Sequence, residues 1–333
     1  MVIDRILIEL ARRGHDTALV CGGPVGPRPY PVVEAGGVFS QYLVAPVKCR
    51  KRFSEWDLLI DVENGIPFFS PLWWKGPRLC LVHHVHTDQW RTRFGPALAG
   101  LGRWAEAQAM PRVYRNDLFV AVSESTAGEL VSLGIAEERI RTVHSGIDLP
   151  SPERIGRRKE SSEPLFVAVG RLVPHKRVEL LLEAWESVRP VTGGRLVVVG
   201  EGPERAYLEG MAGEGVEFTG RADTSRRDEL MGAAWLLVHA AHHEGWGVVI
   251  IEAAAWGVPT LAMDALGVRD AIDEGKSGLL AGTSEEFATR WIALAQDSIR
   301  REELGRGARR RAEGFTWGAT IGAIESIAAE LCG

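Results

Sequence analysis

The chain has 333 residues, of which 45% are hydrophobic and 25% charged, and its formal net charge is −5 at pH 7. This length suits two domains of ordinary size, and the composition is that of a globular protein. The mild negative charge excludes a protein that holds nucleic acid on a broad basic surface. Because the sequence contains neither a long apolar run nor a signal-peptide pattern, we expect a cytoplasmic protein.

The cysteines lie far apart in the sequence, at Cys21, Cys49, Cys80 and Cys332. Their spacing matches no metal-binding motif, and three of them lie in apolar segments. We therefore expect reduced core cysteines and neither disulfides nor a cysteine-bound metal.

The start of the chain predicts a helix followed by a strand. Residues 2–13 form an amphipathic helix pattern, and residues 17–21 read as a short buried strand. An α/β nucleotide-binding domain opens with a strand and a glycine-rich loop before such a helix. We therefore expect the first strand of the N-terminal domain to be missing from this sequence. Restoring upstream codons for that strand should then raise solubility and activity.

Strand-like runs recur through the rest of the first half, at 57–62, 78–82 and 118–123, with helices between them. The Pro/Gly-rich residues 22–37 predict a loop. The basic cluster at 48–52 predicts a solvated loop, with contact to anionic lipid or to an acceptor phosphate as the alternative.

Three histidines follow the strand at 78–82: His83, His84 and His86. Ligands of open α/β sheets lie beyond the carboxyl ends of the strands, so these side chains face a candidate site. Period-two alternation places His84 and His86 on one face. The alternative is that the histidines only cap the strand end. A metal site needs a third ligand, and the spacing indicates none, so we expect no metal.

The second half repeats a strand–glycine–helix pattern. Gly170, Arg171 and Lys176 follow a strand at 165–169, and Gly200 and Gly202 follow a strand at 195–199. An arginine fork and a lysine point charge five residues apart suit one diphosphate. The alternative is a pair of exposed cations. Arg221 follows the next strand, at 216–220.

Two glutamates eight residues apart, Glu244 and Glu252, flank the start of a predicted helix. We expect this helix to begin near Gly247 and to continue through Trp256, until Gly257-Val258-Pro259 stops it. The backbone N–H groups of residues 245–248 would then be free to bind an anion or sugar hydroxyls. Glu252 lies among apolar residues, where a carboxylate needs a partner.

These motifs resemble the donor site of family 4 retaining glycosyltransferases with the GT-B fold. The resemblance lies in Glu244-x7-Glu252, the alanine-rich helix and Gly257-x-Pro259, and other motifs agree in order. It implies two Rossmann-like parallel α/β domains that face a cleft. The predicted domains are residues 1–148 and 165–316, joined by a polar linker at 149–164, with the last helix at about 317–333 packing back on the first domain.

The resemblance also implies roles for individual residues. Glu244 would hold the donor sugar together with Gly245, Trp246, Gly247 and Val248, and Glu252 would bind the ribose. The diphosphate would lie against Arg171 and Lys176, with Gly170, Gly200, Gly202 and Arg221 lining the donor site. One of the three histidines would contact the transferred sugar, and His84 or His86 is the predicted one.

The implied reaction moves a sugar from a nucleotide diphosphate sugar to an acceptor hydroxyl, with retention of the anomeric configuration. The sequence has no Asp-x-Asp motif, so we expect no metal and no cofactor besides this co-substrate. The acceptor stays open between a glycan, a lipid-linked glycan and a small molecule, and the protein could contact the inner membrane face peripherally. The alternatives are a nucleotide-sugar epimerase, a phosphorylase, or a truncated protein that binds nucleotide sugar without turnover.

Overall fold

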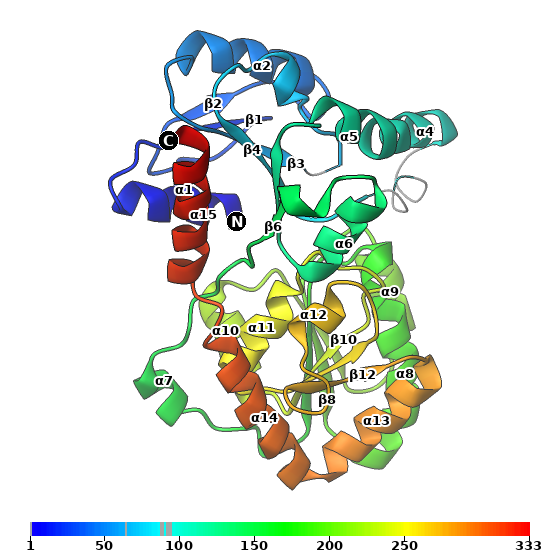
Figure 1. Ribbon diagram of the computed structural model, residues 1–333. Coiled ribbons are helices and arrows are strands. Elements are labelled where there is room, and N and C mark those ends of the chain that lie inside the picture. Colours follow the sequence, from blue (N-terminus) through cyan, green and yellow to red (C-terminus); the bar gives the residue numbers. More distant parts are fainter. Residues whose placement is uncertain (1, 64, 87–89, 91–94) are drawn as a thin grey trace. The chain divides into compact units, whose positions relative to one another are not determined.

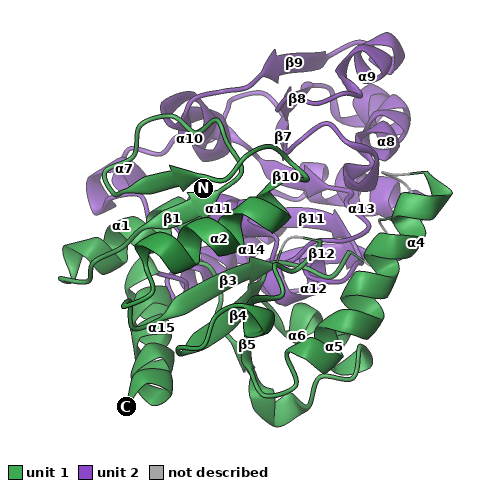
Figure 2. Cartoon of the chain, turned by 90° about the horizontal axis from the view of Figure 1, so that it is seen from above, with its two compact units in different colours: residues 1–146, 317–333 green, residues 147–316 purple. Residues whose placement is uncertain are grey.

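The computed structural model describes residues 2–63, 65–86, 90 and 95–333 (Figure 1). The chain divides into two compact units, which Figure 2 colours separately. Unit 1 comprises residues 1–146 and 317–333, and unit 2 comprises residues 147–316. Both are built on parallel sheets, which confirms the predicted pair of Rossmann-like α/β domains.

Unit 2 contains a six-stranded parallel sheet in the order β12-β11-β10-β7-β8-β9. The strands are β7 Leu165–Val169, β8 Arg195–Val199, β9 Val216–Gly220, β10 Leu236–His239, β11 Thr260–Met263 and β12 Gly278–Ala281. Their nearly continuous apolar runs fit strands that are covered on both faces. Strands β8 and β9 follow β7 on one side of it, and β10, β11 and β12 follow on its other side. The order therefore reverses between β7 and β10, where α/β proteins bind ligands.

Helices cover both faces of this sheet (Figure 1). The helices of unit 2 are α7 Pro152–Gly156, η4 Pro174–Lys176, α8 Val178–Thr192, α9 Arg205–Met211, α10 Thr224–Ala233, α11 Val248–Ala255, α12 Val268–Ala271, α13 Ser284–Gln296 and α14 Ser298–Ala312, of which α7 lies away from the sheet (Figure 1). The core under α8 and α13 is aromatic. The rings of Trp185 and Trp291 have centroids 5.6 Å apart, and Phe166 of β7 packs edge-on against Trp291 at 5.2 Å. This packing anchors β7, whose end carries the candidate site.

Unit 1 contains two parallel sheets. A four-stranded sheet has the order β3-β4-β5-β6, and a separate pair joins β1 to β2. The strands are β1 Leu19–Cys21, β2 Val32–Glu34, β3 Leu59–Glu63, β4 Arg78–Val82, β5 Leu118–Ala121 and β6 Ile140–Thr142. The helices are α1 Val2–Arg12, α2 Gln41–Arg52, η1 Ser70–Leu72, α4 Pro96–Trp104, the π-helical turn η2 Ala105–Ala109, α5 Met110–Val113, α6 Glu124–Ser132, η3 Glu137–Arg139 and α15 Trp317–Cys332. None of the described helices is long and apolar enough to cross a membrane.

The last helix, α15, belongs to unit 1 although it follows unit 2 in the sequence. Nη1 of Arg13 lies 2.6 Å from a carboxylate oxygen of Glu325, and the hydroxyl of Thr320 donates to the carbonyl of His144. On α1, Ile6 is buried, and Ile3, Leu7 and Leu10, which share its face of the amphipathic helix, are half-buried.

Two local predictions in unit 1 are wrong. The predicted loop at 22–37 contains strand β2, because Val32 and Val33 pair with Leu19 and Val20 of β1. The predicted basic loop at 48–52 is the last turn of α2, because Ala45 and Cys49 are spaced four residues apart and bury one face of a helix. The predicted linker at 149–164 lies at the start of unit 2, and the short helix α7 lies within it.

Candidate active site

The predicted site residues of unit 2 follow adjacent strands at the carboxyl edge of its sheet. The loop after β7 and the loop after β10 are bonded to each other at the point where the strand order reverses. The N–H of His242 donates to the carbonyl of His175 at 3.2 Å, and Nε of Arg177 donates to the carbonyl of Ala240 at 2.8 Å. These bonds hold the loop that carries Lys176 against the loop that carries Glu244, where the strand order reverses.

Glu244 is bound by two basic side chains. Nζ of Lys176 forms an ion pair with Oε1 of Glu244, and Nε2 of His239 lies 3.1 Å from the same oxygen. Burial acts to raise the pKa of the Glu244 carboxyl, but the charge of Lys176 and the contact with His239 outweigh burial and lower this pKa well below its ordinary value. Glu244 is therefore ionised at neutral pH, and most of the Lys176 charge is already balanced.

The helix after Glu244 begins where it was predicted, with Gly247 as the N-cap of α11 at φ 67°. It ends at Ala255, with Trp256 as its C-cap. The first intrahelical donor is the N–H of Ile250, which bonds the carbonyl of Gly247 at 2.8 Å. Among the described residues, the N–H groups of Val248 and Val249 have no acceptor. They leave a partly positive helix end that suits an anion or hydroxyl oxygens.

Trp246 is a core residue as well as a predicted donor-binding residue. Its side chain is 3% exposed and packs edge-on against Phe315, with ring centroids 4.8 Å apart. Only its backbone can therefore contact a ligand.

Gly267 packs against the backbone of Glu244. This position requires glycine, because a Cβ there would lie 2.0 Å from the carbonyl oxygen of Glu244. This close approach holds the Glu244 backbone in place.

Gly200 and Gly202 have a packing reason that spacing alone did not show. A Cβ at Gly200 would lie 1.8 Å from the carbonyl oxygen of Gly170, and a Cβ at Gly202 would lie 2.1 Å from that of Leu172. The N–H of Leu172 also donates to the carbonyl of Glu201 at 2.9 Å. The loop after β8 thus packs directly against the loop that carries Arg171, and glycine is required at both positions.

The two predicted diphosphate ligands lie in different environments. Arg171 is exposed, and within the described part of the chain its side chain has no hydrogen bond or ion pair. The same holds for the side chain of Arg221 after β9. Lys176 is half-buried and bound to Glu244. Arg171 is therefore the available cation of the predicted pair.

Glu252 has the partner that its apolar surroundings required. Oε1 of Glu252 lies 3.1 Å from Nη2 of Arg227, which comes from α10. Burial raises the pKa of the Glu252 carboxyl, Arg227 lowers it, and Asp228 and Asp148 raise it again, so that the pKa lies above its ordinary value. The sequence predicted the need for a partner but not Arg227.

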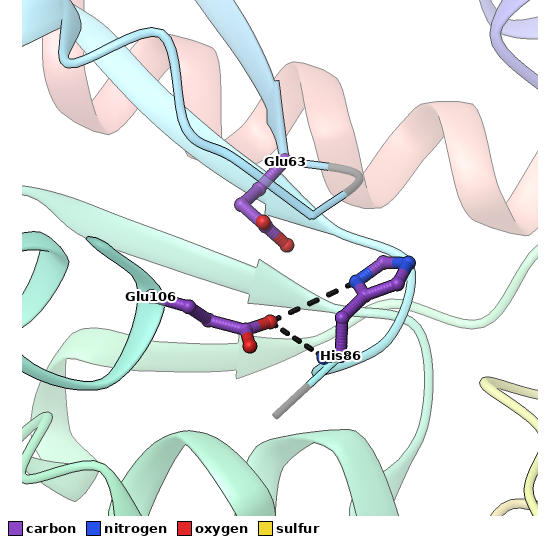
Figure 3. A group of neighbouring side chains, drawn as sticks. All are labelled: Glu63, His86 and Glu106. Atoms are coloured by element: carbon purple, nitrogen blue, oxygen red, sulfur yellow. Dashed lines mark hydrogen bonds and ion pairs between the residues drawn. The ribbon is translucent and has the colours of Figure 1, made fainter. Parts of the chain in front are cut away.

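The predicted histidines lie in unit 1. The rings of His84 and His86 are 3.9 Å apart, as expected for residues on one face. Burial lowers the pKa of His83 to about 4, so this imidazole is neutral at pH 7. His86 is buried between the carboxylates of Glu63 and Glu106 (Figure 3). Its backbone N–H donates to Oε1 of Glu106 at 2.5 Å, and its ring Nδ1 lies 3.7 Å from that oxygen.

Sequence reasoning missed His239, Arg227, Glu63 and Glu106. The sequence does show that His239 ends one apolar strand and that Glu63 ends another. Neither pattern indicates which side chain the residue contacts. The contact of His84 or His86 with a sugar stays a prediction.

Comparison with known proteins identifies the family. The family described as Glycosyltransferase Family 4 matches residues 1–150, and the family described as Glycosyl transferases group 1 matches residues 152–311. A D-inositol 3-phosphate glycosyltransferase of Gordonia bronchialis is 33% identical over 284 residues, which cover 74% of this chain and 60% of that protein. A GDP-mannose-dependent alpha-mannosyltransferase of Mycobacterium tuberculosis is 31% identical over 245 residues, which cover 71% of this chain and 62% of that protein.

The fold agrees with this assignment. The crystal structure of Anabaena HepE in complex with UDP and glucose superposes with a TM-score of 0.78 at 20% identity, over 98% of this chain and 96% of that chain. The matches span about three fifths of the length of these curated relatives. Because the two family matches together run from residue 1 to residue 311, the chain belongs to the family 4 glycosyltransferases of the GT-B type.

Proposed function

We propose that the protein transfers a sugar from a nucleotide diphosphate sugar to an acceptor hydroxyl and retains the anomeric configuration. One observation carries this proposal: an unpaired arginine and an open helix end lie at the same sheet edge. Arg171 and the N–H groups of Val248 and Val249 are the donors a leaving diphosphate needs. They stabilise the negative charge that develops as the glycosidic bond breaks, without a metal or another cofactor.

Glu244 contributes a carboxylate that is ionised before the donor arrives. An ionised carboxylate only accepts hydrogen bonds, so it suits the hydroxyls of a sugar and not its phosphates. Lys176 and His239 hold the carboxylate in place. A bound diphosphate would compete with Glu244 for the ammonium group of Lys176. We expect this ammonium group to contact both the Glu244 carboxylate and a phosphate oxygen of the donor.

The names of related proteins give a practical choice of donors, since they mention GDP-mannose and UDP with glucose. The test incubates the protein with UDP-glucose or GDP-mannose and measures nucleotide binding by calorimetry and diphosphate release with and without added glycans. NMR of the product then gives the anomeric configuration. An inverted product would contradict retention, and isomerised donor without transfer would favour an epimerase. Absence of binding to any nucleotide would overturn the proposal.

Glu252 is proposed to bind the ribose diol of the nucleotide. Glu252→Gln should weaken nucleotide binding about tenfold, because a carboxylate that accepts from two hydroxyls loses one charged acceptor. The Arg227→Met variant is the matched control, since it removes the ion pair but keeps the carboxylate. Calorimetry with UDP and GDP measures both variants. If Glu252→Gln binds the nucleotide as tightly as the parent protein does, Glu252 does not bind the ribose. If the affinities of Glu252→Gln and Arg227→Met fall equally, the effect comes from the lost ion pair, and Glu252 has only a structural role.

We further propose that α2 contacts anionic lipid at the inner membrane face. Leu43 and Val47 are 79% and 52% exposed, and they precede Arg50 and Lys51 on one face of the helix. Arg50, Lys51 and Arg52 have no ion pair among the described residues. Exposed apolar residues beside unpaired cations are typical of a helix that lies on a charged membrane surface.

Replacing Arg50, Lys51 and Arg52 with Gln should weaken binding to vesicles that contain phosphatidylglycerol by about a hundredfold, at about 1 kcal/mol per cation. Co-sedimentation with these vesicles and with pure phosphatidylcholine measures the effect. The matched control replaces three exposed cations of unit 2, Lys276, Arg306 and Arg310, with Gln. Equal binding to both vesicles, or an equal loss in the control, would contradict a lipid-binding α2.

A further inference from the structure

Three buried side chains of unit 1 converge on one point. Glu63 ends β3, His86 follows β4, and Glu106 lies in the π-helical turn η2. Their exposed fractions are 1%, 4% and 0%. One carboxylate oxygen from each glutamate and one ring nitrogen of His86 all lie within 4.8 Å of one another. Figure 3 shows the two carboxyl groups directed toward the imidazole from different elements.

Two of these atoms lack a hydrogen-bond partner although they are buried. Oε1 of Glu63 accepts the N–H of Gly65 at 2.8 Å, but Oε2 has no partner, and neither has Nδ1 of His86. No Lys or Arg among the described residues forms an ion pair with Glu63. A buried carboxylate oxygen without a hydrogen bond, on a side chain without an ion pair, is costly, so some further group must stabilise it.

A shared proton does not account for the arrangement. Burial and the nearby Glu106 charge raise the pKa of Glu63. A proton on Oε2 of Glu63 would still need an acceptor, such as an oxygen of Glu106, and within the described residues Oε2 of Glu63 has no hydrogen-bond partner. Glu106 is bound elsewhere, since it accepts the backbone N–H of His86 and the indole N–H of Trp90. A single cation satisfies the carboxylate oxygen and the ring nitrogen together.

We propose that Glu63, His86 and Glu106 bind a divalent transition-metal ion of the zinc class. Two carboxylate oxygens and one imidazole nitrogen are a ligand set that zinc accepts, with water at the fourth position. The ion would hold the ends of β3 and β4 against η2, and it would fix the ring of His86 through one nitrogen. This inference does not depend on the proposed transfer reaction, whose diphosphate-binding residues lie in unit 2.

The test uses the 333-residue chain after dialysis against a chelator. Calorimetry with ZnCl2, MnCl2 and CaCl2 gives the affinities. The protein is then loaded with zinc and dialysed to remove unbound ions, and mass spectrometry of its metal content gives the stoichiometry. We expect about one zinc ion per chain, bound more tightly than manganese, and no calcium, which requires more oxygen ligands. Glu63→Gln should weaken zinc binding by at least about tenfold, as for loss of a group that holds the metal.

Glu137→Gln is the matched control, since Glu137 is exposed in the same unit and has no ion pair among the described residues. Parent protein that binds no stoichiometric zinc, or Glu63→Gln that binds zinc as tightly as the parent, overturns the proposal. If Glu63→Gln does not fold by circular dichroism, X-ray absorption of the zinc-loaded parent decides. One imidazole among oxygen ligands supports the site, and any sulfur ligand or a different imidazole count overturns it.

Discussion

Replacing Lys176 with Ala should lower the free energy of unfolding by about 3 kcal/mol at neutral pH. The substitution leaves Glu244 ionised and largely buried without its main cationic partner. Urea denaturation of Lys176→Ala, Glu244→Gln and the double variant measures the effect. The double variant should lose less than Lys176→Ala alone, because no unpaired charge remains.

Lys276→Ala is the matched control for this experiment. Lys276 also pairs with an acid, Asp273 at 3.3 Å, but its side chain is 77% exposed. A solvated pair contributes little, so this variant should lose less than about 1 kcal/mol. Equal losses in Lys176→Ala and Lys276→Ala would mean that the contact between Lys176 and Glu244 is worth no more than a surface pair.

The ion pair between Lys176 and Glu244 also predicts how the free energy of unfolding depends on pH. The pKa of Glu244 is lowered in the folded protein from an ordinary value of 4.5. Its contribution to stability is therefore fully present above pH 4.5, and it is lost as the pH falls through the folded-state pKa. In Lys176→Ala this pKa should rise toward or above the ordinary value. The variant should then lose less additional stability than the parent when urea denaturation is repeated from pH 7 down to pH 3.

The architecture was predictable because it depends on short-range patterns. Most strands of unit 2 are apolar runs, and β7 and β8 are each followed by a glycine. The first turn of α11 follows from Gly247 and the apolar residues after it. Backbone positions in a parallel sheet follow from such patterns, since consecutive strand ends meet at one edge. The sequence therefore predicts that Gly170, Arg171, Gly200 and Arg221 lie at that edge.

Side-chain partners were not predictable, because they come from segments that are distant in the sequence. Lys176 and Glu244 are 68 residues apart, and no periodicity indicates that they form an ion pair. His86 and Glu106 are 20 residues apart and meet only because a π-helical turn directs Glu106 at the end of β4. The error at residues 48–52 has a related cause. A run of charges predicts solvent exposure, and the last turn of a helix can be as exposed as a loop.

Arg171→Ala should reduce transition-state stabilisation by roughly 2–4 kcal/mol, a loss of about 30- to 900-fold in kcat/KM. The side chain of Arg171 is exposed and has no hydrogen bond or ion pair in the described part of the chain, so the free energy of unfolding should change by less than about 0.5 kcal/mol. This separates it from Lys176→Ala, which should harm both stability and turnover.

The ligand comparison identifies what Arg171 binds. Its loss should weaken the binding of a nucleoside diphosphate more than that of the parent nucleoside, because the guanidinium pairs with phosphate oxygens and not with the base. Arg310→Ala is the matched control, since Arg310 is an exposed arginine of the same unit with no ion pair among the described residues. Calorimetry with UDP and uridine, or with GDP and guanosine, measures the difference. Equal losses for nucleoside and diphosphate, or an equal loss in Arg310→Ala, would show that Arg171 does not bind the diphosphate and would leave the amides of α11 as the principal anion site.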